Sequence, residues 1–149
     1  MRKTFTLFLS ILIVFTTSCK TNNSAEDILL GFCAEYPIDS KIYSSVSDGV
    51  HTEIIDAEML DALYGIKEIP IREFALVLYG KVNTVREIGV FITNNGDNEI
   101  EILELASKRI DFLSSFADGE GFIKKYRGVL VYGFVEDASY AEAVFDSII

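Results

Sequence analysis

Apolar positions follow two different rhythms along most of the chain. In some segments they recur every three or four residues, which is typical of the buried face of an amphipathic helix. In others they form almost continuous runs, which indicate buried strands. The pattern predicts helices between Ser24 and Pro37, over 57–64, over 98–117 and after Asp137, and strands over 74–79, 88–92, 122–126 and 129–135, with a weaker extended stretch over 41–46.

Polar and glycine residues mark the ends of these helices. Ser24, Asp56 and Asp137 each stand just before a helical segment, where a side-chain oxygen can accept a hydrogen bond from a free backbone N–H. Gly65 follows the second helical segment, in the place of a C-terminal cap glycine. Pro37 ends the first helix, because the residue before a proline is biased away from helical geometry.

The order of the elements indicates the fold class. It runs helix, helix, strand, strand, helix, strand, strand, helix, and each strand pair is joined by a short turn. Strand pairs separated by long helices fit an antiparallel sheet with helices packed on one face. We therefore expect residues 25–149 to form one α+β domain, a two-layer sandwich with about four strands.

The first eighteen residues have the features of an export signal. Arg2 and Lys3 are followed by an uncharged apolar segment over 5–15 and by small residues over 16–18, the arrangement of a secretory signal peptide. As a helix, that apolar segment would reach about 16 Å. This is too short for a hydrocarbon core of about 30 Å, so the sequence predicts a cleaved signal rather than a transmembrane anchor.

Cys19 directly follows this segment and is a candidate for lipidation. Ser18 before Cys19 resembles the bacterial lipobox, in which the cysteine receives a diacylglycerol and becomes the mature N-terminus. Two acyl chains would give stable membrane anchoring, and residues 19–24 would form a short tether. Thr16 departs from the lipobox, which usually has a bulky aliphatic residue there, so ordinary secretory cleavage remains the alternative.

Charge and cysteine content limit the classes of function. The chain has 13 Lys and Arg against 23 Asp and Glu, a net charge of −10, and cleavage after residue 18 would leave 11 against 23, or −12. This balance argues against nucleic acid as a partner, because its phosphates would be repelled. Two cysteines and one histidine are too few for a Cys/His zinc site. We interpret Cys33 as a small buried hydrophobe.

Several segments together resemble a known family of small lipoproteins. They are residues 59–66, 72–78, 85–91, 106–109 and 128–132, with an acidic turn and a final helix after the last of them. Over about residues 25–148 the chain is similar to domain-of-unknown-function family 4358 of Gram-positive bacteria. The resemblance implies an exported, lipid-anchored α/β domain and implies no activity or catalytic residue.

Two oxygen-rich segments are candidate cation sites. His51 lies near Glu53 and Asp56, which makes a metal site conceivable, although a solvated loop at a helix start is the simpler interpretation. The loop 94–99, which contains Asp97, is rich in oxygen ligands for a hard cation such as calcium. It lacks the alternating acidic ligands and distal Glu of an EF-hand, and a turn with a helix cap explains it more simply.

Other charged groups fit a solvated surface. Glu99, Glu101 and Glu104 lie on the polar face of the long helix. The basic run 124–127 could contact anionic lipid or a wall polymer, but the charged face of an edge strand is the better explanation. Because no nucleophile elbow, phosphate loop or dinucleotide motif is present, we predict no catalytic, cofactor or metal site.

These observations favour a non-enzymatic accessory or interaction domain. We expect it to be lipid-anchored at the extracytoplasmic face of the cell membrane and to contact a protein partner at the cell surface. A lipoprotein that binds a small ligand or peptide is the alternative, because seven Tyr and eleven Phe residues could line a groove. An enzyme would need perturbed carboxylates, or His51, in a cleft.

Overall fold

Four helices and six strands make up the part of the chain that the computed structural model describes, residues 23–36, 38–46, 49–50, 52–66, 71–81, 84–93 and 98–149. The helices are α1 (Ala25–Glu35), α2 (Ala57–Tyr64), α3 (Glu99–Ser114) and α4 (Ala138–Ile148). The strands are β1 (Ile42–Ser44), β2 (Thr52–Ile54), β3 (Ile71–Tyr79), β4 (Arg86–Thr93), β5 (Glu120–Tyr126) and β6 (Val129–Val135).

All six strands belong to one mixed sheet with the order β2-β1-β3-β4-β6-β5. β1 and β2 are parallel, and every other neighbouring pair is antiparallel. The two predicted hairpins, β3–β4 and β5–β6, both form, and β4 pairs with β6 to join them at the centre. The sheet therefore extends beyond the hairpins through the two short strands at one edge.

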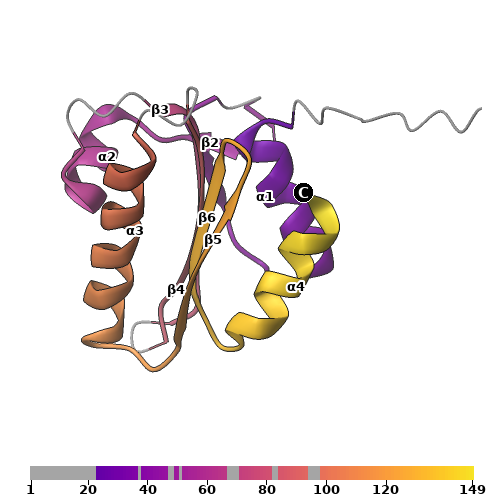
Figure 1. Cartoon of the computed structure of the whole chain (residues 1–149), viewed down its shortest axis with the longest axis vertical. Coiled ribbons are helices and arrows are strands. Elements are labelled where there is room, and N and C mark those ends of the chain that lie inside the picture. Colours follow the sequence, from indigo (N-terminus) through magenta and orange to yellow (C-terminus); the bar gives the residue numbers. More distant parts are fainter. Residues whose placement is uncertain are drawn as a thin grey trace, which may run out of the picture.

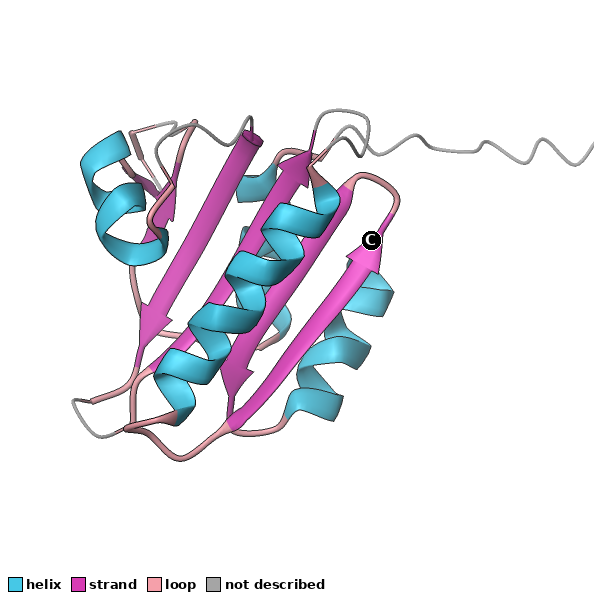
Figure 2. Ribbon diagram, turned by 60° about the vertical axis from the view of Figure 1, so that its left-hand side comes forward, coloured by secondary structure: helices cyan, strands magenta, loops and turns pink. Residues whose placement is uncertain are grey.

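The helices cover both faces of this sheet (Figure 1). α1 and α4 pack on one face and α2 and α3 on the other, and Figure 2 is turned so that the α2–α3 face comes forward. Two separate apolar clusters fill the two interfaces. The first includes Phe32, Val77, Val90, Val131 and Phe145, and the second includes Tyr64, Phe74, Phe91, Ile102 and Tyr132.

The predicted α+β character is confirmed, but the two-layer arrangement with an antiparallel sheet of about four strands was wrong, because β1 and β2 pair in parallel. The sheet has six strands and helices on both faces. Every residue of β4 is buried, because a strand in the middle of a covered sheet has no solvent-facing side. Continuous apolar runs, rather than alternating ones, are the pattern of such strands. β1 and β2 have three residues each, too short to show any periodicity.

The predicted starts of α1, α2 and α4 are confirmed by hydrogen bonds, whereas Pro37, the predicted end of the first helix, lies outside the described residues. The Ser24 hydroxyl accepts from the Asp27 N–H at 3.0 Å, and the Asp27 carboxylate accepts from the Ser24 N–H. Asp56 and Asp137 cap α2 and α4 in the same way, each accepting at 2.8 Å. Gly65 ends α2 with φ of 67°, a left-handed conformation that favours glycine.

No helix in the described part of the chain has the length and apolar character needed to cross a membrane. The predicted signal segment over 1–18, Cys19 and most of the predicted tether lie outside the described residues.

Candidate functional site

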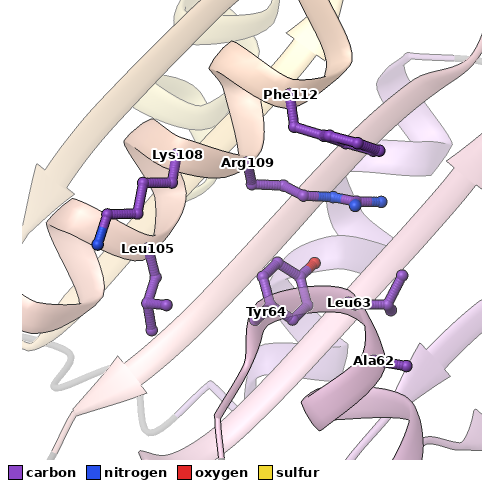
Figure 3. Close-up of a pocket in the computed structure, with 7 residues that line it drawn as sticks. All are labelled: Ala62, Leu63, Tyr64, Leu105, Lys108, Arg109 and Phe112. Atoms are coloured by element: carbon purple, nitrogen blue, oxygen red, sulfur yellow. The ribbon is translucent and has the colours of Figure 1, made fainter.

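A cleft lies between α2 and α3 (Figure 3). Its volume is about 270 Å³. α2 contributes a short, an aliphatic and an aromatic side chain to one wall, and α3 contributes an aliphatic, an aromatic and two cationic side chains to the other. The lining residues are Ala62, Leu63, Tyr64, Leu105, Lys108, Arg109 and Phe112.

A buried ion pair lies beneath the cleft and joins the sheet to α3. Glu87 on β4 is completely buried, and Arg109 on α3 meets its carboxylate side-on. Arg109 Nε donates to Glu87 Oε1 at 2.9 Å and to Oε2 at 3.0 Å, while Nη2 donates to Oε2 at 2.6 Å. Such a two-pronged contact fixes both position and direction, so α3 is held at a defined place above the strand.

Two tyrosine hydroxyls complete the surroundings of Glu87. Tyr132 on β6 donates a hydrogen bond to Glu87 Oε1. Tyr64, at the end of α2, lies 3.1 Å from the same carboxylate oxygen, and its hydroxyl also contacts the Tyr132 hydroxyl. The carboxylate is therefore approached by α2, α3 and β6 at once, which satisfies a buried charge that would otherwise be strongly destabilising.

These contacts keep the two tyrosines and the arginine in one protonation state near neutral pH. Burial raises the pKa of Tyr64 and Tyr132 well above the ordinary value, and the negative charge of Glu87 adds to both shifts. Burial acts to lower the pKa of Arg109, but hydrogen bonds and charge from Glu87 outweigh it and raise the pKa. The tyrosines stay neutral and the arginine stays charged.

The arginine also forms part of the cleft surface. Its guanidinium carbon lies 5.7 Å from the ring centre of Tyr64 and 5.4 Å from that of Phe112, and Figure 3 shows the group reaching from α3 toward α2. Phe112 is 56% exposed and packs edge-on against Phe116, with ring centres 5.2 Å apart. An exposed aromatic pair thus adjoins the cleft.

Lys108 gives the cleft rim a positive charge that no described acidic residue neutralises. The ion pairs of the described residues include the partners of Lys41, Lys124, Lys125 and Arg109, but none involves Lys108. Because Arg109 is neutralised by Glu87, the available charge of the lining belongs to Lys108. The cleft therefore combines apolar walls with one available cation.

Of the three residues in the candidate site around His51, the structure describes Glu53 and Asp56. His51 lies outside the described residues. Glu53 pairs with Lys41 across β1 and β2, and Asp56 caps α2. Cys19 and the loop residues 94–97, including Asp97, also lie outside the described part. No group of three metal-ligating side chains occurs among the residues that are described.

Several of the charged surface groups have structural partners. Glu99 pairs with Lys125 at 2.6 Å, while Glu101 and Glu104 are exposed on α3. Lys124 pairs with Asp146 and lies 3.7 Å from Glu142. Much of the basic run over 124–127 is therefore neutralised on β5, the edge strand.

Cys33 lies half-buried on α1, against the apolar core beside α4. Burial raises the pKa of its thiol to about 11. The group is uncharged at neutral pH and is a poor nucleophile in that state.

The residues beneath the cleft were not predicted from the sequence as a site. Glu87 is separated by 22 positions from Arg109 and by 45 from Tyr132, so only the tertiary structure brings them together. One signal was present, since Glu87 directly precedes the predicted strand 88–92. A carboxylate at the start of a buried strand needs a partner.

Comparisons with models of known protein families, with curated proteins and with solved structures find no match to this chain. By its own fold and cleft, the protein is a mixed-sheet domain with helices on both faces of the sheet and a small surface cleft.

Proposed function

We propose that this protein is an exported, lipid-anchored interaction domain without enzymatic activity, which binds a protein partner at the outer face of the cell membrane. Export and anchoring rest on the signal features of residues 1–18 and on Cys19. The resemblance to domain-of-unknown-function family 4358 supports the same location. The cleft between α2 and α3 carries the functional part of the proposal.

The ionisable groups of the cleft favour binding over catalysis. A general acid or base works best when its pKa lies near the operating pH. The pKa of Tyr64 and that of Arg109 are both shifted away from neutrality, and both groups are tied to the buried Glu87. These residues are suited to fixing the shape of a surface rather than to transferring protons.

The size of the cleft favours one side chain of a partner over a whole small molecule. Small-molecule sites commonly enclose about 300–1,000 Å³ and bury most of the ligand. This cleft has about 270 Å³ and lies open at the surface. Its flank carries the exposed pair Phe112 and Phe116, and aromatic residues beside a small pocket are typical of binding hot spots.

Charge complementarity defines the segment that the cleft would receive. Leu63, Leu105 and Phe112 offer contacts to an apolar side chain. Lys108 offers an ammonium group without an acidic partner in the described structure. The cleft is therefore suited to a partner segment in which an apolar side chain stands next to a carboxylate.

A free peptide or small acid is the alternative occupant, and the same observation favours it. An apolar group joined to a carboxylate would satisfy the walls and Lys108 equally well. The two occupants differ in what remains bound during purification, because a protein partner buries surface beyond the cleft, including Phe116.

Site-specific photocrosslinking in the native membrane tests the proposal. A photoreactive residue in place of Ala62 should crosslink to one protein species, and Phe112→Ser should abolish that crosslink. Ile100 supplies the matched control, since it is 74% exposed on the same helix and does not line the cleft. A photoreactive residue there should not crosslink, and Ile100→Ser should leave the Ala62 crosslink intact.

Two results would overturn this function. Equal crosslinking from positions 62 and 100 would indicate random collisions rather than a binding site. A small molecule that copurifies with the wild-type protein and is lost from Phe112→Ser, without any protein crosslink, would favour the alternative occupant.

A further inference from the structure

Arg86 is a buried arginine without a carboxylate partner in the described structure. It begins β4 and is only 6% exposed. Its Nη1 donates to the Val85 carbonyl at 3.1 Å, and its guanidinium carbon lies 5.7 Å from the ring centre of Phe134. No described carboxylate lies within ion-pair distance of it. Buried charges are normally paired, so this arrangement calls for an explanation.

The neighbouring residue provides a direct comparison. Glu87 follows Arg86 along β4, and its partner Arg109 uses Nε and Nη2 together to bind one carboxylate. Arg86 has the same pair of donors free. Its Nε is buried and has no hydrogen-bond partner, and no hydrogen bond from its Nη2 occurs among the described residues. The side-on edge that binds carboxylates and phosphates is therefore unused in Arg86.

A buried tyrosine hydroxyl lies on the same side of the sheet as this edge. Tyr79 on β3 stands directly opposite Arg86 in the antiparallel register, so both side chains leave the sheet on the α1–α4 side. The Tyr79 hydroxyl is buried and makes no well-aligned hydrogen bond, and it interacts with the hydroxyl of Tyr36, which an anion would have to replace as its acceptor. Buried polar atoms without partners are rare, and a missing water or ion is a common reason for them.

We propose that Arg86 and Tyr79 form a binding site for a small oxyanion, either a carboxylate or a phosphate group. The guanidinium edge supplies two parallel donors and the positive charge, and the Tyr79 hydroxyl supplies a third donor. A water molecule would satisfy the hydrogen bonds but would leave the buried charge without a counter-charge. The site lies on the opposite side of the sheet from the α2–α3 cleft and does not depend on the proposed function.

The acidic neighbours of the site define the competing explanation. Glu136 and Asp137 follow β6 and act electrostatically on the nearby Tyr36, and Glu136 acts on Tyr79 as well. Asp137 is engaged in capping α4. Glu136 is exposed and forms no ion pair with Arg86. If the Glu136 carboxylate moved inward, an oxyanion would have to displace it from the Arg86 guanidinium.

The test is an NMR titration of the full-length protein in detergent micelles, at constant ionic strength set by potassium chloride. The Nε–H signal of Arg86 is assigned by its loss in Arg86→Lys. Inorganic phosphate and, separately, acetate are then added. A saturable shift with either anion supports the site, and the preferred anion identifies the ligand as a phosphate or a carboxylate. No saturable shift with either would overturn the proposal.

Three variants define the specificity of that response. Arg86→Lys keeps a positive charge but loses the two-pronged edge, and it should lose saturable binding, measured by the anion-dependent rise in melting temperature. Tyr79→Phe removes one hydroxyl and should weaken binding about tenfold. Arg127→Met removes an exposed cation in the turn between β5 and β6 and should bind as the wild type does. Equal loss in Arg127→Met would overturn the proposal, as would an Arg86 signal that moves in Glu136→Gln without added anion.

Discussion

Gly89 and Tyr132 lie directly opposite each other on β4 and β6, and the tyrosine ring occupies the space where a side chain on Gly89 would lie. A β-carbon at Gly89 would be 2.1 Å from Cε1 of Tyr132. The ring has little freedom to move aside, because its hydroxyl binds the Glu87 carboxylate. The hydrogen-bond network around Glu87 beneath the cleft therefore requires a glycine at position 89.

Gly89→Ala should therefore destabilise the protein by about 1–3 kcal/mol, the usual cost of overpacking a core. Urea unfolding followed by circular dichroism measures the change. Gly31→Ala is the matched control, because its β-carbon would meet only Ile148 Cδ1 at 3.8 Å and would lie in a helix, where alanine is favoured. Equal stability of Gly89→Ala and the wild type would show that the Tyr132 ring can adopt another position.

Loss of Arg109 should lower the free energy of unfolding more than loss of the negative charge on Glu87 does. Arg109→Met leaves the fully buried carboxylate without its cation and should destabilise the fold by about 3–5 kcal/mol. Glu87→Gln leaves the arginine near the surface, where water can solvate it, and should cost less. The two variants are compared by urea unfolding at neutral pH.

The double variant Glu87→Gln with Arg109→Met separates charge from shape. With both charges gone, it should recover most of the stability lost in Arg109→Met alone. A double variant as unstable as the sum of the two single variants would show that the arginine acts through packing against Tyr64 and Phe112 rather than through the buried charge.

The sequence pattern predicted the elements well where local chemistry determines them. The caps at Ser24, Asp56 and Asp137 act within three residues, so their hydrogen bonds could be inferred from the order of residues alone. The hairpins β3–β4 and β5–β6 likewise depend on short turns. The number of layers was mispredicted, because a continuous apolar strand does not reveal that helices cover both of its faces.

The candidate site could not be predicted in the same way. Glu87 and Arg109 belong to different elements, and each looks like an ordinary surface charge in its own segment. The same holds for Arg86, whose buried position depends on the register that places it opposite Tyr79. Contacts of this kind depend on the order of the strands in the sheet. Local hydrophobic periodicity does not reveal that order.

The ion pair between Lys124 and Asp146 should make a small, pH-dependent contribution to stability. Hydrogen bonds from Lys124 and then Tyr126 lower the pKa of Asp146, while the hydrogen bond from Asp146 raises the pKa of Lys124. A lowered carboxyl pKa gives stability that is present above the unfolded value of about 3.9 and is lost as the pH falls through the folded value. A raised lysine pKa gives stability that is present below about 10.4 and is lost as the pH rises through the folded value.

Asp146→Asn should therefore lower the melting temperature slightly between about pH 5 and pH 9, and the difference from the wild type should close at both extremes. Asp146 is exposed and Lys124 is partly exposed, so 1 M salt should also reduce the difference. Melting curves at each pH measure it. Asp111→Asn, an exposed carboxylate without an ion pair in the described structure, is the control and should show no such profile. A difference that persists at pH 2 would contradict the assignment.

Cys19→Ala should abolish lipid attachment and either release the protein into the medium or leave it unprocessed. The physical reason is that the thiol of Cys19 is the proposed acceptor of the diacylglycerol, whose two chains supply the stable anchoring. Labelling with a radioactive fatty acid, followed by fractionation of cells and medium, measures both effects. Cys33→Ala is the matched control, because that cysteine lies half-buried in the folded domain, and it should keep the label and the membrane location. If ordinary secretory cleavage occurs instead, neither the wild type nor Cys19→Ala will carry the label, and both will be found in the medium.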